Sequence, residues 1–246
     1  MPGEDLAARC EDLTKTYRTA ASTVHALRGI TTAFPRSALT AVAGPSGSGK
    51  SSFLRLLVGM DRPTGGSLVV DKLPLHRAGS RARRGLRKRV GYVYQRASDN
   101  FFPHLTVDEH LRLAEARSTA QPRIEIAELE ELLGIEPRLG HLPAELSGGE
   151  QARAALAQVL AGGASIIVAD EPTAELDSGS ATEVIGTIRT LVDRGVTIIV
   201  ATHDRAVMSR SDDLVELEHG VLRTKARGKG ATPRLVVPSS HLPVRE

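Results

Sequence analysis

The stretch LTAVAGPSGSGKS, residues 39–51, decides the fold of this chain. Its first five residues, Leu39–Ala43, are apolar apart from one threonine and predict a short strand. The loop 44–51 matches the pattern G-x-x-x-x-G-K-[ST]. Residues 50–58 predict a helix that ends at Gly59. A strand, a glycine-rich loop and a helix in this order predict a phosphate-binding loop.

The chemistry of this loop suits the phosphates of a nucleotide. Glycines let consecutive backbone N–H groups curl round phosphate oxygens, and the helix directs its positive end at them. Lys50 adds a positive charge for the β- and γ-phosphates, and the Ser51 hydroxyl is a candidate Mg²⁺ ligand. An incidental turn of glycine and serine would not explain the flanking strand and helix. The predicted nucleotide ligands are Gly44, Pro45, Ser46, Gly47, Ser48, Gly49, Lys50, Ser51 and Ser52.

A second apolar strand, predicted over residues 165–169, ends in two acids, Asp170 and Glu171. Asp170 is a candidate to hold Mg²⁺, directly or through water, and Glu171 to polarise an attacking water as general base. Two adjacent acids before Pro172 can also mark an ordinary helix start. Their combination with the phosphate loop favours the catalytic interpretation.

The pentapeptide Leu146-Ser147-Gly148-Gly149-Glu150 indicates a second phosphate site. Ser147 and Glu150 form a capping box before an apolar helix, which alone would be a routine helix start. The glycine pair is unusual because glycine destabilises the first turn of a helix. Bare N–H groups at the positive end of a helix favour an anion. Since Lys50 already serves one phosphate site, this site requires a second nucleotide, or the γ-phosphate of a nucleotide on a partner chain.

Apolar strands alternate with helical patterns along the chain, which predicts an α/β fold with a mostly parallel core sheet. Residues of about 96–160 carry few strand signals and predict an inserted helical subdomain. Alternation over residues 8–34 predicts an antiparallel sheet beside the core. From Thr224 onward, Gly, Pro, Ser and basic residues predict a disordered basic tail over 224–246. Further predicted elements are strands at 90–94 and 196–201 and helices at 106–133 (interrupted near Pro122), 150–160 and 179–192.

The composition narrows the class of protein. The 246 residues carry a net charge of +3, and no apolar run nears the roughly 20 residues that span a bilayer. Cys10 is the only cysteine, and the N-terminus lacks a secretory pattern, so we expect a cytosolic chain. Basic clusters at 81–89 and 223–245 are interpreted as solvated surface, with nucleic acid or anionic lipid as the alternative. An aromatic content of 3% disfavours a protein that stacks single-stranded bases.

Together the ordered motifs resemble those of the ATP-binding subunits of ABC (ATP-binding cassette) transporters, whose signature the pentapeptide 146–150 matches. Tyr17 matches the aromatic residue that stacks on adenine, and Gln95 the glutamine that contacts Mg²⁺ or the lytic water. Asp177 lies in the loop that crosses the dimer interface, and His203 matches the switch histidine at the γ-phosphate. Each alone could be an ordinary structural residue, but their order favours the family interpretation.

The resemblance covers about residues 6–222 as a single ATP-binding domain. It implies a P-loop NTPase fold: an α/β, RecA-like, mostly parallel sheet core with an antiparallel β subdomain and an inserted helical subdomain. It implies ATP as the nucleotide and Mg²⁺ as the metal, held by Ser51, Gln95 and, through water, Asp170. The implied catalytic residues are Lys50, Gln95, Glu171 and His203.

One cassette without a fused transmembrane domain implies that two chains pair, most simply as a homodimer. Each ATP then lies between the Lys50 loop of one chain and the signature of the other. The residues implied to face the partner's ATP are Ser147, Gly148, Gly149, Glu150 and Asp177. The resemblance further implies a polytopic membrane permease as partner, no nucleic acid partner, and a place on the cytoplasmic side of the cell membrane.

Some residues depart from the family pattern. Glu150 replaces the commoner glutamine, Gln158 stands where arginine is common, and the loop 95–103 looks longer than in many relatives. The segments 59–66 and 169–177 resemble the lipoprotein-release, macrolide-efflux and cell-division group. One alternative is a non-transport ABC ATPase that regulates a membrane-bound cell-wall or cell-division complex. A structural scaffold with an inactive site is another, which the intact motifs disfavour.

Overall fold

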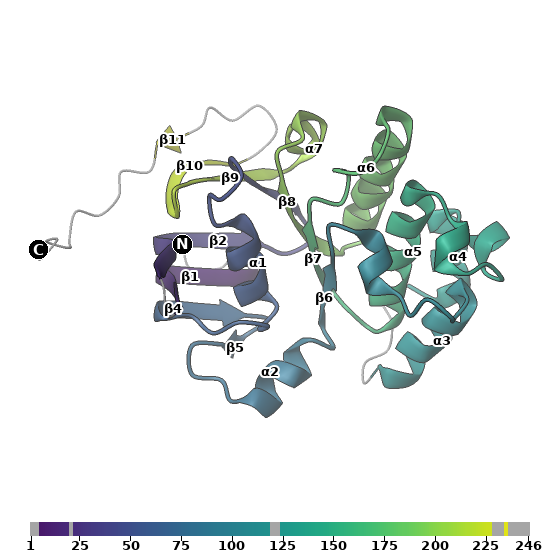
Figure 1. The fold of residues 1–246 in the computed structure, drawn as a ribbon, viewed down its shortest axis with the longest axis horizontal. Coiled ribbons are helices and arrows are strands. Elements are labelled where there is room, and N and C mark those ends of the chain that lie inside the picture. The colour runs from purple at the N-terminus through teal and green to yellow at the C-terminus, as the bar shows by residue number, and fades with distance from the viewer. Residues whose placement is uncertain (1–4, 20–21, 119–123, 228–233, 236–246) are drawn as a thin grey trace, which may run out of the picture.

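The computed structural model describes residues 5–19, 22–118, 124–227 and 234–235, and its strands form two sheets (Figure 1). Within these residues, one sheet has seven strands in the order β11-β10-β9-β3-β8-β7-β6. The other has four strands in the order β2-β1-β4-β5. The predicted α/β fold, with a mostly parallel core sheet and an antiparallel β subdomain, is confirmed.

The centre of the larger sheet is parallel and buried. Every residue of β3 (Leu39–Ala43), β7 (Ile166–Asp170) and β8 (Thr197–Thr202) is buried, as expected for strands covered on both faces. On either side, β6 (Val90–Val93) pairs with β7 and β9 (Asp213–Glu218) pairs with β3, both in parallel. The carboxyl ends of β3 and β7 therefore open at one edge of the sheet, the usual position of a site in such folds.

Helix α1 (Lys50–Leu57) lies between the two sheets (Figure 1). Its Phe53, Leu54 and Leu57 are fully buried in an apolar cluster that also takes in side chains of both sheets. Phe53 packs on Phe34 of the small sheet with ring centroids 5.7 Å apart. The helix that carries Lys50 is thus fixed from both faces, which holds the phosphate loop in place.

The antiparallel sheet extends beyond the prediction for residues 8–34. It comprises β1 (Leu6–Arg18), β2 (Thr23–Pro35), β4 (Gly65–Val70) and β5 (Leu73–Pro74), and α2 (Ser80–Leu86) follows it. The sequence analysis did not predict β4 and β5, because a glycine pair opens β4 and β5 has only two residues.

A group of helices lies beside β6 and β7, formed by α3 (Val107–Arg117), α4 (Ile126–Leu133) and α5 (Gly148–Ala161) (Figure 1). The pattern predicted over 106–133 thus forms two helices, and its break near Pro122 lies outside the described residues. Short 3-10 turns span Ala97–Asn100, Glu136–Arg138 and Pro143–Glu145, and α6 (Ser178–Asp193) and α7 (Arg205–Arg210) complete the helices.

The carboxyl-terminal segment departs from the predicted disordered tail. Strand β10 (Val221–Arg227) pairs with β9, and β11 (Arg234–Leu235) pairs with β10, so 224–227 and 234–235 are in strands. Thr224 is buried, and the Lys225 Nζ donates to the Ala33 carbonyl at 3.0 Å. This basic segment therefore adds strands to the larger sheet, which a composition argument does not detect. The rest of the predicted tail lies outside the described residues.

Candidate functional site

Two glycines with left-handed backbone fix the path of the phosphate loop. Gly44 has φ +147° and Gly49 has φ +103°. A Cβ on Gly44 would lie 2.2 Å from the Leu217 carbonyl oxygen, and one on Gly49 would lie 2.4 Å from the Ala26 carbonyl oxygen. Only glycine permits this close approach to β9 and β2.

Lys50 follows the glycines of this loop and is the first residue of α1. Its Nζ donates to the carbonyl oxygens of Gly44 at 2.7 Å and Pro45 at 3.3 Å. The side chain is buried, and Nζ lies 3.5 Å from Glu171 Oε1. A buried ammonium at the positive end of a helix makes this a strongly anion-favouring position.

A cleft of about 780 Å³ above the loop gathers most of the predicted ATP ligands. Its lining residues are Tyr17, Val24, His25, Ala26, Pro45, Ser46, Gly47, Gly49, Lys50, Ser51, Ser52, Gln95, Glu171 and His203. Of the predicted loop ligands, Gly44 and Ser48 do not line the cleft, and Ser48 is buried. Sequence reasoning missed residues 24–26, whose pattern is that of any strand start.

Tyr17 lies in this cleft with its ring held by two neighbours. Its hydroxyl donates to Asp61 Oδ2 at 2.7 Å, and Lys15 Nζ lies 4.5 Å from the ring centroid. Burial raises the pKa of the Tyr17 hydroxyl, so it remains a protonated donor at neutral pH. Neither Lys15 nor Asp61 was predicted, because the residues that support Tyr17 come together only in the fold.

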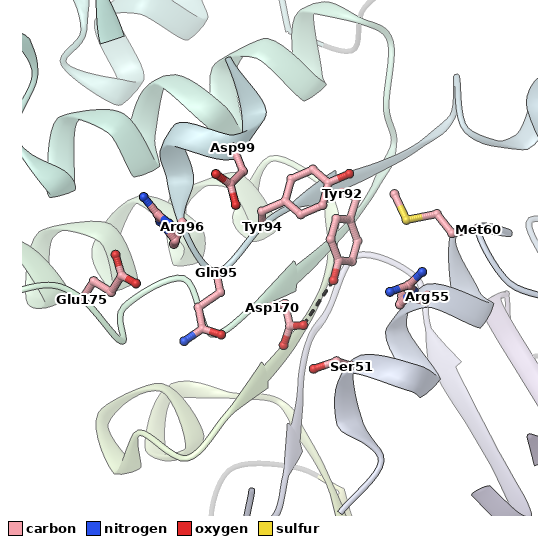
Figure 2. A pocket seen from close by; sticks show the side chains of 10 residues that line it. All are labelled: Ser51, Arg55, Met60, Tyr92, Tyr94, Gln95, Arg96, Asp99, Asp170 and Glu175. Atoms are coloured by element: carbon pink, nitrogen blue, oxygen red, sulfur yellow. Dashed lines mark hydrogen bonds between the residues drawn. The ribbon is translucent and has the colours of Figure 1, made fainter. Parts of the chain in front are cut away.

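A second cavity, of about 470 Å³, adjoins the cleft and shares Ser51 and Gln95 with it (Figure 2). Inside it, the Tyr92 hydroxyl donates to Asp170 Oδ2 at 3.2 Å. Burial, and then the negative charge of Asp170, raise the pKa of Tyr92. Tyr92 therefore stays a donor and fixes one oxygen of the carboxylate. From the sequence, Tyr92 is predicted only as a strand residue, because its contact with Asp170 forms in the folded sheet.

The residues at this cavity fit a Mg²⁺ ion. Asp170 Oδ1 is buried and has no hydrogen-bond partner in the described part of the chain, so one carboxylate oxygen is free to bind a cation. Ser51 and Gln95 line the same cavity and add hydroxyl and amide oxygens, the ligand type that Mg²⁺ prefers. Asn100 holds the strand end before Gln95, because its side chain bonds the Tyr92 carbonyl at 2.9 Å and the Tyr94 N–H at 3.1 Å.

Glu171 connects Lys50 to His203. It has φ +50°, an uncommon backbone for a residue with a side chain, and strain of this kind clusters at functional sites. Its Oε2 lies 2.5 Å from His203 Nδ1, while Oε1 faces the Lys50 ammonium. The Glu171 N–H donates to the Ala201 carbonyl of β8 at 2.8 Å, which fixes this conformation. The structure thus brings these three predicted catalytic residues into contact.

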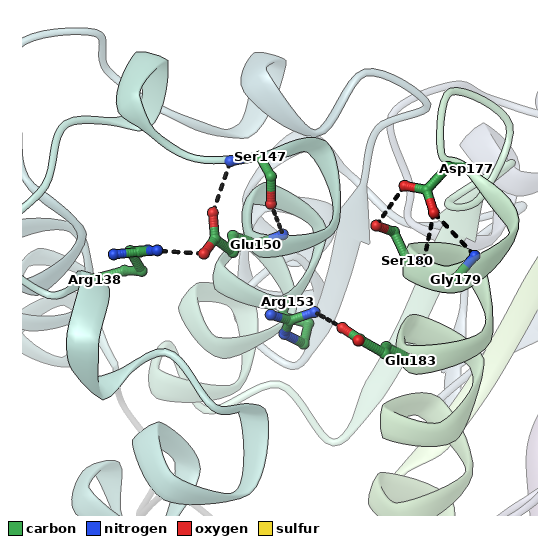
Figure 3. Close-up of polar contacts among 8 residues, drawn as sticks. All are labelled: Arg138, Ser147, Glu150, Arg153, Asp177, Gly179, Ser180 and Glu183. Atoms are coloured by element: carbon green, nitrogen blue, oxygen red, sulfur yellow. Dashed lines mark hydrogen bonds and ion pairs between the residues drawn. The ribbon is translucent and has the colours of Figure 1, made fainter.

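The pentapeptide forms the predicted capping box at the start of α5 (Figure 3). Ser147 Oγ accepts from the Glu150 N–H at 3.3 Å, and Glu150 Oε2 accepts from the Ser147 N–H at 2.7 Å. The Arg138 Nε donates to Glu150 Oε1 at 2.7 Å, and this bond, followed by the bond from the Ser147 N–H, lowers the pKa of Glu150 to about 2. None of the pentapeptide residues lines the cleft above Lys50.

Asp177 caps the neighbouring helix α6 (Figure 3). Its Oδ1 accepts from the N–H groups of Gly179 and Ser180, and its Oδ2 accepts from the Ser180 hydroxyl at 2.6 Å. These bonds lower the pKa of the Asp177 carboxyl. The starts of α5 and α6 lie close together, since a Cβ on Gly149 would lie 3.1 Å from Ser180 Cβ, and Asp177 does not line the cleft of its own chain.

A phosphate loop between a parallel strand and a helix, with two acids at the end of β7, which is separated from β3 by β8, defines a P-loop NTPase. The ABC transporter family model matches residues 27–174. The chain belongs to the ABC transporter family, and its fold is that of an ATP-binding cassette ATPase. The predicted family resemblance is confirmed.

Three relatives illustrate the extent of the similarity. The lipoprotein-releasing system ATP-binding protein LolD of Legionella pneumophila (strain Lens) is 33% identical, over 89% of this chain and 97% of that protein. The macrolide export ATP-binding/permease protein MacB of Brucella melitensis biotype 1 is 37% identical over 86% of this chain. The chain spans 33% of that MacB protein's length. A dimeric ATP-binding cassette in a post-hydrolysis state, bound to ADP and Pi, superposes with a TM-score of 0.78 at 28% identity, covering 89% of this chain and 98% of that one.

Across the residues that the structure describes, no helix has both the length and the apolar character needed to cross a bilayer.

Proposed function

We propose that this chain is the ATP-binding and ATP-hydrolysing subunit of an ABC transporter. Two copies close on two ATP molecules, and hydrolysis reopens the pair and drives a separate membrane permease. The observation that carries the proposal is the position of Glu171, whose carboxylate contacts both the Lys50 ammonium and the His203 ring at the end of β7.

Each residue that one chain contributes to an ATP site has a chemical role in this proposal. The backbone of the loop 44–51 and Lys50 bind the β- and γ-phosphates of ATP, and Tyr17 stacks on the adenine. Ser51, Gln95 and Asp170 hold Mg²⁺, which when bound neutralises charge on the phosphate oxygens. Tyr92 orients Asp170 through the hydrogen bond between them.

Hydrolysis proceeds by attack of water on the γ-phosphorus of ATP. Glu171 accepts the proton of the attacking water as its oxygen bonds to phosphorus, and the bond to the β-phosphate oxygen breaks to release ADP. His203 Nδ1 donates to Glu171, which leaves Nε2 on the far side of the ring for the γ-phosphate. Gln95 lines both cavities and orients the water.

The partner chain completes each site. Ser147 and the bare N–H groups of Gly148 and Gly149 bind the γ-phosphate of the ATP held by the other chain. The loop at Asp177 crosses the interface beside them. Two observations support this assignment: these residues lie outside the chain's own cleft, and a solved relative is a dimer.

The membrane permease is the second partner that we propose. LolD is named as a component of a lipoprotein-releasing system and MacB as an ATP-binding/permease protein, which supports a site of action at a membrane. On this proposal the chain lies at the cytoplasmic side of the cell membrane, bound through the permease, with no nucleic acid partner.

The variant Glu171→Gln tests the catalytic assignment. We expect ATP turnover to fall by about 10²–10⁴-fold, the usual contribution of a general base. ATP binding should persist, and a dimer trapped by ATP should appear in sedimentation velocity. The control Glu131→Gln, which removes an exposed carboxylate of α4, should leave turnover and dimerisation unchanged.

Retained turnover in Glu171→Gln would remove this residue from the role of general base. Absence of any ATP-dependent dimer would contradict the shared-site assembly. For the membrane partner, affinity capture from solubilised membranes should recover a polytopic protein, whereas recovery of ribosomes or DNA would overturn the transport assignment.

A further inference from the structure

The signature helix carries an acid where an anion is expected to bind. Glu150 lies in the first turn of α5, three residues after Ser147. Its carboxylate is ionised at neutral pH, as for any glutamate, and the bond from Arg138 favours the ionised form further by lowering its pKa. A fixed negative charge at this place opposes the approach of a second anion such as a phosphate. The structure must therefore offset the charge of Glu150.

Arg138 is the cation that meets this carboxylate. Its Nε donates to Glu150 Oε1 at 2.7 Å, while Oε2 is used by the Ser147 N–H (Figure 3). The nearby Arg153 of α5 is committed elsewhere, since its guanidinium pairs with Glu183 of α6 at 3.0 Å. Arg138 thus forms the only ion pair of Glu150 within the described residues.

The backbone that carries Arg138 is anchored. Arg138 ends a 3-10 turn, with its N–H bonded to the Ile135 carbonyl and its own carbonyl accepting from His141. The next residues bond the start of α3, because the Val107 N–H donates to the His141 carbonyl and the Asp108 N–H to the Leu139 carbonyl. The guanidinium therefore projects toward Glu150 from a fixed base.

We propose that Arg138 is a positioning residue for the signature: it neutralises Glu150 and holds its carboxylate in the capping box, so that the Ser147 end of α5 accepts the partner's γ-phosphate. This inference rests on the proposed function, in which that phosphate binds there. It assigns a role to a residue outside every motif of the sequence. A glutamine at position 150 could make the same capping bond without a charge to offset.

The test is a double-mutant cycle between Arg138→Gln and Glu150→Gln, in the full-length chain carrying Glu171→Gln to trap the dimer. The readout is the ATP concentration at half-maximal dimer formation, measured by sedimentation velocity. ATP affinity of the monomer, from a fluorescent ATP analogue at low protein concentration, is the second readout. Arg112→Gln serves as the matched control, because it removes the cation of an exposed ion pair with Asp108 on α3.

We expect Arg138→Gln to raise the ATP concentration for dimer formation about fivefold, the scale of one unpaired charge at a helix start. Monomer affinity should not change, and Arg138→Lys should restore part of the loss. In the Glu150→Gln background, Arg138→Gln should have no further effect. A purely structural role would alter the melting temperature without this rescue.

Three outcomes would overturn the proposal. Arg138→Gln could dimerise like Arg112→Gln, which would show that the charge of Glu150 does not matter. The double variant could be as weak as Arg138→Gln, which would indicate direct contact of Arg138 with the phosphate. If the parent chain forms no ATP-dependent dimer at all, the proposed shared site fails, and this inference fails with it.

Discussion

Replacing Tyr92 by phenylalanine removes one oxygen atom and leaves the ring. The Tyr92 ring packs edge-on against Tyr94, with centroids 4.8 Å apart, and phenylalanine can keep this contact. What is lost is the hydrogen bond at 3.2 Å to Oδ2 of the buried Asp170. Because Asp170 Oδ1 has no partner within the described residues, the variant leaves neither carboxylate oxygen with a side-chain donor.

The expected loss of stability follows from this geometry. A hydrogen bond to a charged group contributes about 1.5–3 kcal/mol. The observed separation is longer than the roughly 2.7 Å that is usual between two oxygens, so the lower end applies, about 1.5 kcal/mol. The matched control Tyr94→Phe removes a hydroxyl that forms no hydrogen bond in the described part of the chain. We expect that variant to stay within about 0.5 kcal/mol of the wild type.

Urea unfolding of the wild type and both variants measures the free energy of unfolding. A titration with Mg²⁺, followed through binding of a fluorescent ADP analogue, measures the Mg²⁺ midpoint. Loss of an outer-shell partner usually costs about 10–100-fold in metal affinity, and we expect a shift at the lower end, about tenfold, for Tyr92→Phe alone. Equal unfolding free energies for the two variants, or an unchanged Mg²⁺ midpoint, would refute the argument that this hydroxyl positions Asp170.

Three further predictions concern other parts of the chain. Gly148→Ala places a Cβ 2.8 Å from the flexible end of Leu176, so urea unfolding should change by no more than about 1 kcal/mol, while the ATP-driven dimer seen in sedimentation is lost. The pKa of Glu150 is lowered from 4.5 to about 2, so its contribution to stability is present above pH 4.5 and lost as the pH falls toward 2. The difference in unfolding free energy between wild type and Glu150→Gln should shrink in that window. Cys10 is buried and its pKa is raised to about 12 by burial, so mass spectrometry should find iodoacetamide adducts only after unfolding in urea; labelling of the native chain would contradict its burial.

The parts of the fold that the sequence predicted are those with a local cause. Strands β3, β7 and β8 are short apolar runs, each followed by a helix, and such a run is typical of a strand covered on both faces. Strand β4 could not be predicted in this way. Its opening glycines look like a turn, and it forms because β1 supplies a partner, with Cys10 opposite Leu68. Pairing of segments so distant in the sequence leaves no local pattern.

The candidate site likewise has residues with a local sequence pattern and residues that only the fold brings together. The phosphate loop, Asp170 and Glu171 are contiguous motifs, so the sequence alone could pick them out as candidates. The residues that hold the site side chains in place come from elsewhere in the chain. Tyr17 donates a hydrogen bond to Asp61, and Tyr92 donates one to Asp170. Such supporting contacts depend on side-chain directions that only the assembled sheets determine, so no spacing rule reveals them.

The glycines of the signature have a structural reason that is separate from anion access. A Cβ on Gly148 would lie 2.8 Å from Leu176 Cδ2, and one on Gly149 would lie 3.1 Å from Ser180 Cβ. The start of α5 is therefore packed closely against Leu176 and the first turn of α6, so a side chain at either glycine would require a small shift of its neighbour. Because Asp177 caps α6 with both carboxylate oxygens, its side chain is occupied within its own chain. The Asp177 side chain therefore has the local role of holding the start of α6 against the start of α5.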